Sequence, residues 1–321
     1  KEARTGHRFI TDNLIVVRPL LLARPEILPD SIFKVVSIQF WKQIKKVIPD
    51  YLNYNINLIV YDARWIKILK GTHPFMKIAY YLFDEVRNNG KDNSLNKTRY
   101  RFDEFACRNS DIIFAMTRKL AETRVQYNSN IVILGNGSIK EYKKVNNNLK
   151  IKHSIAFIGN FRNWIDIELL KKLIVLRKDI LFVFAGPIEA NMNDFLRELL
   201  NLNTNTMYFG KASKENMPDL YRMFDGVIVP YKQNDFIQST RPIKIVESIF
   251  SGTPVVTIPM DGYEENEFIR FATSPETFSE QIDYILSHPI SQESKTYTDF
   301  IKENSWKKKS EIIDYEFSKI L

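Results

Sequence analysis

Cysteine is almost absent from this sequence. Cys107 is the single cysteine among 321 residues, which excludes a framework of internal disulfides and is typical of a reducing compartment. The four histidines, His7, His73, His153 and His288, are scattered and match no metal-binding spacing. We therefore expect a cytoplasmic protein that uses no bound metal or other cofactor.

Long apolar runs are missing as well. The sequence contains no stretch of 18 apolar residues and no signal peptide, so we expect this chain not to span a membrane. Basic runs of five or more residues, zinc-finger spacings and nucleic-acid motifs are also absent, and we expect no nucleic-acid partner. GxSxG, Walker and HExxH motifs are absent too, which excludes the enzyme classes that depend on them.

What remains is an ordinary globular composition with an uneven charge. Hydrophobic residues make up 44% and charged residues 26%, and 321 residues are enough for two domains. Residues 1–150 hold 26 Lys and Arg against 14 Asp and Glu, whereas residues 151–321 hold 20 against 24, for a net charge of +8. The basic first half suits an anionic membrane surface or a phosphate-bearing substrate.

Short apolar runs alternate with segments of helical spacing along most of the chain. This alternation predicts the α/β class, with two tandem Rossmann-like domains and an interdomain cleft. The polar segment 138–152 is the predicted linker between them. The predicted strands are Leu14–Arg18 (in a parallel sheet), Ile32–Phe40, Ile56–Asp62, Lys77–Phe83, Asp111–Met116, Asn130–Leu134, Ser154–Ile158, Ile180–Ala185, Thr206–Phe209, Gly226–Val229 and Val255–Ile258.

The stretch Tyr231–Val256 combines a polar loop, a buried helix, a Gly turn and a strand. We predict the helix over residues 242–250, with Pro242 at its first helical position. The free N–H groups of a helix start, together with nearby cations, favour an anion such as a diphosphate. The polar residues that crowd around this start are Ser239, Thr240, Arg241, Lys244 and Glu247.

Lys244 and Glu247 are three residues apart and therefore share one helix face. On that face the lysine would meet phosphate, while the carboxylate would accept hydrogen bonds from sugar hydroxyls. The alternative is a capped surface helix whose charges face water. Against it, Gly252-Thr253-Pro254 returns the chain at once into an apolar strand, which favours a helix buried against a sheet with its start at the ligand-binding edge.

A second strand end carries a glycine beside polar side chains. Gly159 and Asn160 follow the strand predicted over 154–158, and Arg162 lies two residues further on. A glycine there lets the backbone approach a phosphate, whose charge Arg162 would neutralise. The dinucleotide fingerprint of three spaced glycines is absent, so an NAD site is not favoured. Taken alone, such a Gly turn is more often structural.

A third strand end, after Tyr208, has the composition of a nucleobase site. Phe209, Gly210 and Lys211 combine an aromatic ring, a flexible backbone position and a cation, although such a set alone is most often a turn. Tyr231, at the start of the polar stretch, completes the predicted donor-binding residues.

Two adjacent acids, Asp84 and Glu85, end an apolar strand in the first half. Ligands bind at the carboxyl ends of parallel strands, so either acid could take the proton of an acceptor hydroxyl. The alternative is a solvated acid pair with Arg87 as its counter-ion. Asp84 ends the apolar run directly, and we prefer it as the base.

Several stretches resemble the bacterial group-1 glycosyltransferases of the GT-B fold, in the order in which that family has them. They are YYLFDE, ILGNGSIKEY, FIGNFRNWIDIELLKKL, LFVFAGP, MYFGKASKENMPDLYRMFDGVIVPY, RPIKIVESIFSGTPVV and ENSWKKKSEII. The resemblance implies an acceptor-binding domain over residues 1–145, whose usual first strand is missing or rearranged. It also implies a nucleotide-sugar domain over residues 153–300 and a last helix, 301–321, that packs back on the first domain.

The resemblance also implies roles for single residues. Glu247 would bind ribose, Lys244 and Arg162 the diphosphate, and Gly210 with its neighbours the base. Retaining members carry a Glu where this chain has Ser239, which leaves retention or inversion open. The inverting glucuronosyltransferase-like enzymes are similar in their Pro-x-Lys-x-x-Glu helix and use an Asp base, which Asp84 matches.

From these features we expect a hexosyl- or glycuronosyltransferase. Its donor would be a UDP-sugar in preference to a GDP-sugar, and its acceptor a glycan or lipid-linked hydroxyl in cell-surface polysaccharide or glycoconjugate synthesis. The basic first half suggests peripheral contact with the anionic inner face of the cell membrane. Two alternatives stay open, namely a sugar-nucleotide epimerase of the same fold and a non-catalytic GT-B partner subunit.

Overall fold

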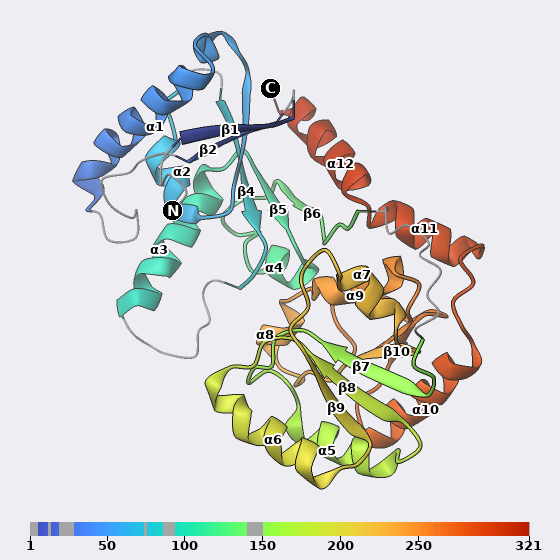
Figure 1. Ribbon diagram of the computed structural model, residues 1–321. Coiled ribbons are helices and arrows are strands. Elements are labelled where there is room, and N and C mark those ends of the chain that lie inside the picture. The colour runs from blue at the N-terminus through green and yellow to red at the C-terminus, as the bar shows by residue number, and fades with distance from the viewer. Residues whose placement is uncertain are drawn as a thin grey trace. The chain divides into compact units, whose positions relative to one another are not determined.

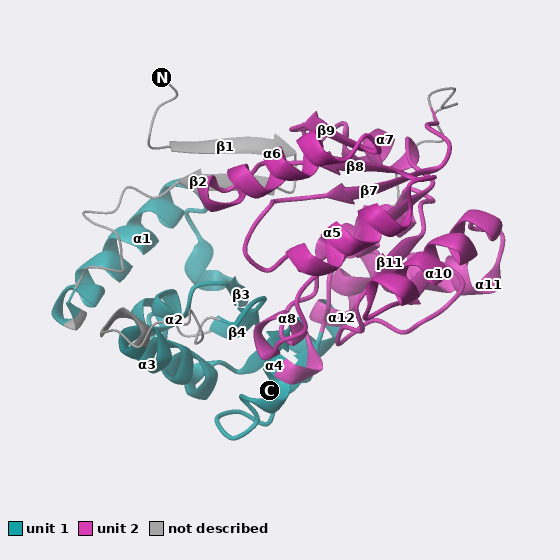
Figure 2. Cartoon of the chain, turned by 90° about the horizontal axis from the view of Figure 1, so that it is seen from below, with its two compact units in different colours: residues 1–116, 120–133, 314–321 teal, residues 117–119, 134–313 magenta. Residues whose placement is uncertain are grey.

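The computed structural model describes residues 6–11, 14–18, 29–73, 76–85, 94–139 and 150–320. Two compact units make up the chain (Figure 2). Unit 1 contains residues 1–116, 120–133 and 314–321, and unit 2 contains residues 117–119 and 134–313. The predicted linker at 138–152 lies mostly outside the described residues.

Unit 1 is built on a four-stranded parallel sheet with the strand order β3-β4-β5-β6 (Figure 1). Separately, β1 and β2 form an antiparallel pair. Near the end of the chain, Phe317 packs edge-on against Phe114 of the sheet, with ring centroids 6.0 Å apart. The elements are β1 (Gly6–Thr11), β2 (Leu14–Arg18), α1 (Phe33–Val47), β3 (Ile56–Val60), α2 (Ala63–Leu69), β4 (Met76–Leu82), α3 (Ser94–Asn109), β5 (Ile112–Ala115), α4 (Arg118–Glu122) and β6 (Ile131–Ile133).

Two strand predictions in this half are wrong. Residues 32–40 are predicted as a strand, but Ile32 ends a 3-10 turn and residues 33–40 belong to helix α1, because Phe33, Val36 and Trp41 recur at helical spacing and are buried together. The strand Leu14–Arg18 exists, but it pairs antiparallel with β1 and belongs to no parallel sheet. Neither run of sequence shows which partner it will meet.

Unit 2 holds a six-stranded parallel sheet with the order β12-β11-β10-β7-β8-β9. Helices α5, α6 and α10 lie on one side of it, and α7 and α9 on the other (Figure 1). The elements are β7 (Ser154–Ile158), α5 (Ile167–Leu176), β8 (Leu181–Ala185), α6 (Asn193–Leu202), β9 (Thr206–Gly210), α7 (Met217–Arg222), β10 (Gly226–Val229), α8 (Asp235–Gln238), α9 (Ile243–Phe250), β11 (Val255–Thr257), β12 (Ile269–Phe271), α10 (Pro275–Ser287) and α11 (Lys295–Glu303). The last helix, α12 (Trp306–Lys319), begins in unit 2 and ends in unit 1.

The strand order of this sheet reverses between β7 and β10. From β7 the chain adds β8 and β9 on one side, then returns to place β10 on the other side of β7. In open parallel sheets, ligands bind outside the carboxyl ends of the strands at such a reversal. Both predicted parallel sheets are present, and the α/β fold class is confirmed.

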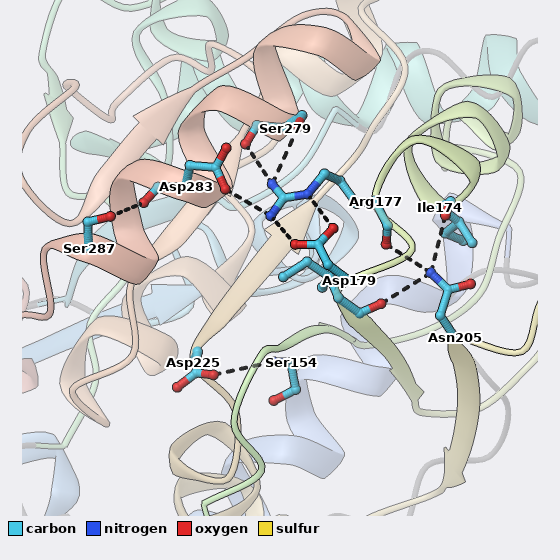
Figure 3. Close-up of polar contacts among 10 residues, drawn as sticks. Ser154, Ile174, Arg177, Asp179, Asn205, Asp225, Ser279, Asp283 and Ser287 are labelled. Carbon is cyan, nitrogen blue, oxygen red and sulfur yellow. Dashed lines mark hydrogen bonds and ion pairs between the residues drawn. The ribbon is translucent and has the colours of Figure 1, made fainter.

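The amino edge of the same sheet is closed by a network of polar side chains (Figure 3). Arg177, after α5, donates to Asp179 at 2.7 Å, pairs with Asp283 of α10 at 2.8 Å and donates to the carbonyl of Ser279 at 3.1 Å. The side-chain nitrogen of Asn205 donates to three backbone carbonyls. These bonds fix the turns that lead into the strands.

Along the part of the chain that the structure describes, no helix is both long enough and apolar enough to cross a bilayer.

Candidate active site

Three glycines stand side by side at the carboxyl edge of the sheet in unit 2. Gly159, Gly186 and Gly210 follow or end β7, β8 and β9, and each has a positive φ, of 146°, 133° and 92°. A Cβ on Gly186 would lie 2.1 Å from the carbonyl oxygen of Gly159, so side chains are sterically excluded there. The edge is therefore bare backbone. Gly186 was not among the predicted site residues, although it follows its strand as Gly159 does.

Lys244 of α9 lies over this edge at the reversal of strand order. Its Nζ atom stands 4.2 Å from the ring centroid of Phe157 in β7 and 5.2 Å from that of Tyr231, just after β10. A Cβ on Gly159 would come within 2.3 Å of the same Nζ, so the glycine makes room for the ammonium group. Lys244, Gly159 and Tyr231, all predicted site residues, meet at one point.

Glu247 follows Lys244 on α9 and is fixed by a tyrosine. The hydroxyl of Tyr221, a buried residue of α7, donates to Oε2 of Glu247 at 3.2 Å. Burial raises the pKa of Glu247, while the Tyr221 bond and the charge of Lys244 partly oppose that rise. One carboxylate oxygen is thus held by the protein, which sets the orientation of the other. Tyr221 was not among the predicted site residues, because nothing local to it indicates the contact.

The start of α9 differs in detail from the prediction. Pro242 is the N-cap with an extended ψ of 117°, not the first helical residue. Ser239 and Thr240 do not cap α9, since their hydroxyls donate backwards to the carbonyls of Asp235 and Ile237 at 3.0 and 2.8 Å. Both residues therefore end the short helix α8, which lies where the sequence predicted only loop.

Arg241 makes several contacts with its neighbours in unit 2. Its guanidinium lies 4.8 Å from the ring centroid of Tyr263 and donates to Oδ1 of Asn304 at 3.1 Å. A Cβ on Gly262 would be 3.3 Å from the same guanidinium. The side chain borders an open pocket of about 730 Å³.

Arg162 and Asn160 lie on the loop after β7. The Nε of Arg162 forms an ion pair with Glu189 at 2.7 Å, and its guanidinium stacks 4.9 Å from the ring centroid of Trp164. Asn160 is exposed. The ion pair is itself partly exposed, so an incoming anion can compete with Glu189 for the arginine.

The predicted base site at the end of β9 is open to solvent. Phe209 is 42% exposed and Lys211 is exposed. The hydroxyl of the preceding Tyr208 donates to the carbonyl of Gly186 at 2.8 Å and so links β9 to the turn after β8. An exposed aromatic face beside a glycine edge suits a nucleobase.

In unit 1 the structure separates Asp84 from Glu85. Both oxygens of Glu85 bind the buried Arg124, at 2.6 and 2.7 Å, and Arg124 also pairs with the buried Asp103. Asp103 in turn accepts a hydrogen bond from the hydroxyl of Tyr80 at 3.0 Å. Glu85 thus belongs to an internal network, and its predicted counter-ion Arg87 lies outside the described residues.

Oδ1 of Asp84 accepts a hydrogen bond from the backbone N–H of Glu85 at 2.9 Å. Burial raises the pKa of Asp84. The hydrogen bond from the Glu85 backbone lowers this pKa in part, and the negative charge of Glu85 raises it further. A partly buried carboxylate with a raised pKa has the properties of a general base.

Among the described residues, no group of three or more His, Cys, Asp and Glu is placed to hold a metal ion. The expectation of a reaction without metal stays a prediction.

Comparison with known proteins defines the class of this chain. Residues 138–305 match the family model described as glycosyl transferases group 1. Because the match covers more than half of the sequence, the chain belongs to the group-1 glycosyltransferases, a family of enzymes.

A curated relative is "Putative teichuronic acid biosynthesis glycosyltransferase TuaH" of Bacillus subtilis (strain 168). It is 31% identical over 102 residues, which are 32% of this chain and 25% of the relative. The match thus spans about a quarter of that relative's length.

Solved structures show the same fold at low identity. Anabaena Alr3699/HepE, in complex with UDP and glucose, aligns with a TM-score of 0.60 and 14% identity over 90% of this chain and 83% of that one. The catalytic domain of Arabidopsis thaliana starch synthase IV, bound to ADP and acarbose, aligns with a TM-score of 0.58 and 10% identity over 89% and 76%. S. aureus TarM aligns with a TM-score of 0.55 and 14% identity over 83% of this chain and 54% of that one. These likenesses establish the GT-B fold.

Proposed function

We propose that this protein transfers a sugar from a nucleoside-diphosphate-sugar to an acceptor hydroxyl. The observation that carries this proposal is the position of Lys244, whose ammonium lies over the Gly159 turn where the strand order reverses, with Glu247 beside it on α9. A diphosphate needs cations and free backbone groups, and a ribose needs a fixed carboxylate. This edge supplies both within one helix.

Lys244 would act mainly on the leaving group. As the bond between the sugar carbon and the diphosphate oxygen breaks, negative charge grows on that oxygen. The ammonium of Lys244 and the start of α9 favour this charge, and Arg162 adds a second cation once it exchanges Glu189 for phosphate. Bare backbone at Gly159 and Gly186 lets the phosphates approach closely.

Asp84 would serve as the base. It would take the proton of the acceptor hydroxyl as the acceptor oxygen forms its bond to the sugar carbon and the diphosphate departs with the electron pair. A single displacement of this kind inverts the configuration at that carbon. The residue at position 239 supports an inverting reaction. Ser239 has no carboxylate, which retaining relatives have at this position, and its hydroxyl donates to the carbonyl of Asp235.

The exposed rings of Tyr61 and Phe83 offer an acceptor surface next to Asp84. They are 56% and 46% exposed, and their centroids are 6.2 Å apart. Their apolar faces suit the carbon face of a sugar ring. The relative named for teichuronic acid biosynthesis supports a cell-surface polysaccharide as the product. The neighbours solved with UDP favour UDP-sugar over GDP-sugar. We propose a cytoplasmic reaction because the chain has a single cysteine.

A direct test measures nucleotide release from UDP- and GDP-sugars with and without a panel of glycan and lipid-linked acceptors. We expect release of UDP that depends on acceptor and yields a glycoside of inverted configuration. A product that retains the donor's configuration would contradict the role of Asp84.

A sugar-nucleotide epimerase is the second candidate, supported by one structural neighbour. UDP-GlcNAc 2-epimerase of Neisseria meningitidis aligns with a TM-score of 0.51 and 12% identity over 91% of this chain and 83% of that one. In the same assay an epimerase would convert the donor without an acceptor and form a new sugar-nucleotide. A non-catalytic partner subunit would give neither product.

A further inference from the structure

Helix α1 in unit 1 carries apolar side chains on two faces, and only one of these faces packs into the core of the unit. Phe33, Val36 and Trp41 point inward and pack with Ile68 and Leu69 of α2 in a buried cluster. These inward side chains anchor the helix to its unit, so the fold does not need the apolar side chains on the outer face.

The outer face combines lysines with apolar side chains. At 3.6 residues per turn its six exposed residues fall within about 120° of the helix circumference, and we call them the α1 face. Val35 and Ile38 lie between lysines on this arc and are 47% and 46% exposed. The α1 face consists of Lys34, Val35, Ile38, Lys42, Lys45 and Lys46.

Acidic residues are missing from α1. Its sequence, FKVVSIQFWKQIKKV, contains no Asp or Glu, so the four lysines form a field of one sign. Three more apolar residues after the helix are also exposed, namely Ile48, Leu52 and Tyr54 at 41%, 50% and 57%.

We propose that the α1 face docks on an anionic lipid surface. Lysine stems lie along apolar surface while their ammonium groups reach lipid phosphates, and Val35 and Ile38 enter the boundary between headgroups and acyl chains. The inference deepens the proposed function and rests on it for its purpose, which is delivery of a lipid-linked acceptor. Binding itself requires no donor chemistry.

Other occupants fit the α1 face less well. A second copy of the chain would bring eight lysines together without an acid on either helix, and their charges would repel. A nucleic acid would meet the lysines, but it would leave Val35 and Ile38 facing phosphates in water. Lipid satisfies both kinds of side chain.

The test is sedimentation of the purified chain with vesicles of phosphatidylglycerol and phosphatidylcholine at about 0.1 M salt, where surface charges still interact. The variant Lys42→Glu/Lys45→Glu/Lys46→Glu should bind these vesicles more weakly by about 100-fold or more, because each lysine near the surface contributes about fivefold. Val35→Ser/Ile38→Ser should weaken binding by roughly 5- to 20-fold through lost apolar burial. Neither variant should bind phosphatidylcholine vesicles.

A matched control reverses three lysines of unit 2. Lys172→Glu/Lys302→Glu/Lys307→Glu makes the same change in net charge at exposed positions and should bind almost as the wild type does. Equal loss in the control would overturn the proposal, since general charge would then explain binding. The proposal would also be overturned if the protein bound soluble heparin tightly, with no change in Val35→Ser/Ile38→Ser, and did not bind the vesicles. A fall in Tm of that variant by several degrees would show protein packing on the face, and this would also overturn it.

Donor hydrolysis by the same variants separates this inference from the proposed function. The α1 variants should keep the UDP affinity of the wild type. Vesicle binding without any transferase activity would support the docking surface and contradict the proposed function. Full transferase activity without vesicle binding would support the proposed function and contradict the docking surface.

Discussion

The two edges of the sheet in unit 2 carry similar side chains in opposite circumstances. At the amino edge Arg177 is paired with Asp179 and Asp283, and Asn205 binds three carbonyls (Figure 3). At the carboxyl edge Lys244 lies over two aromatic rings and a glycine, and it forms no ion pair with any carboxylate of the described residues. The charged groups at the amino edge are paired with one another, whereas the cation at the carboxyl edge is available to a ligand.

This difference distinguishes structural charges from functional ones. The bonds around Arg177 raise its pKa and lower that of Asp179, as expected of groups whose charged forms are stabilised by the fold. Glu247 at the other edge shows the reverse, because its burial raises the pKa and disfavours its charge until a ligand binds. Substitutions at the two edges should therefore change different properties.

The largest effect on activity is expected in unit 1. Two adjacent residues there show the same contrast, since Asp84 is the proposed base and Glu85 belongs to a structural ion-pair network. Asp84→Asn should lower kcat by about 10²- to 10⁴-fold, because the base is lost, with little change in the free energy of unfolding. Its matched control, Glu85→Gln, should cost about 3 kcal/mol of stability, because the buried Arg124 loses one of its two carboxylate partners and keeps only Asp103. Steady-state kinetics and urea unfolding measure the two. Full activity in Asp84→Asn would remove it as the base.

Lys244→Ala should lower kcat by about 10²- to 10³-fold, since the cation that stabilises the leaving diphosphate is lost. Its urea midpoint should stay near that of the wild type, because no ion pair of the fold is broken. Lys172→Ala, an exposed lysine of α5, is the control and should change neither quantity. A Lys244→Ala protein that unfolds readily would make this lysine a structural residue.

Glu247→Gln should weaken donor binding by about 10- to 100-fold, the effect of losing a charged acceptor for ribose hydroxyls. The raised pKa of Glu247 adds a pH signature. Its protonated form is favoured in the folded protein, so that contribution to stability is present below the usual pKa near 4.5 and is lost as pH rises through the folded-state pKa.

At neutral pH Glu247→Gln should thus be as stable as the wild type or more so. If the ionised carboxylate binds ribose, the donor affinity of the wild type should fall as the pH is lowered. Because the pKa of Glu247 is raised, this fall should begin at a higher pH than it would for a Glu with the usual pKa. Calorimetric titration against pH measures both trends, and a donor affinity that is constant down to pH 4.5 would count against the ribose contact.

The smallest effect on activity is expected at the amino edge. Arg177→Met should reduce the free energy of unfolding by about 1 to 3 kcal/mol through lost hydrogen bonds, with the ion pairs contributing little because both aspartates are mostly exposed. The kcat of the folded fraction should match the wild type. A large drop in kcat would break the contrast between the two edges.

Sequence alone predicted most strands and α9, because apolar runs ended by glycine are local signals. It predicted Lys244, Glu247 and Gly159 as site residues because they stand in short motifs at element ends. It could not separate Asp84 from Glu85, since Arg124, the partner that decides the matter, is 39 residues away in the chain.

The missed elements have the same kind of cause. Helix α1 carries β-branched residues on a helical pattern, and only its packing against α2 selects between the two periods. The four-residue helix α8 is too short for a periodic signal, and so the sequence predicted a loop there and did not show that Ser239 and Thr240 end a helix.

The central claim is that the carboxyl edge around Lys244 binds the diphosphate of the donor. Its most direct test is calorimetric titration of wild type and Lys244→Ala with both UDP and uridine. We predict that the wild type binds UDP much more tightly than uridine, and that Lys244→Ala removes most of this difference while uridine binding is unchanged. An equal advantage of UDP over uridine in both proteins would contradict the claim.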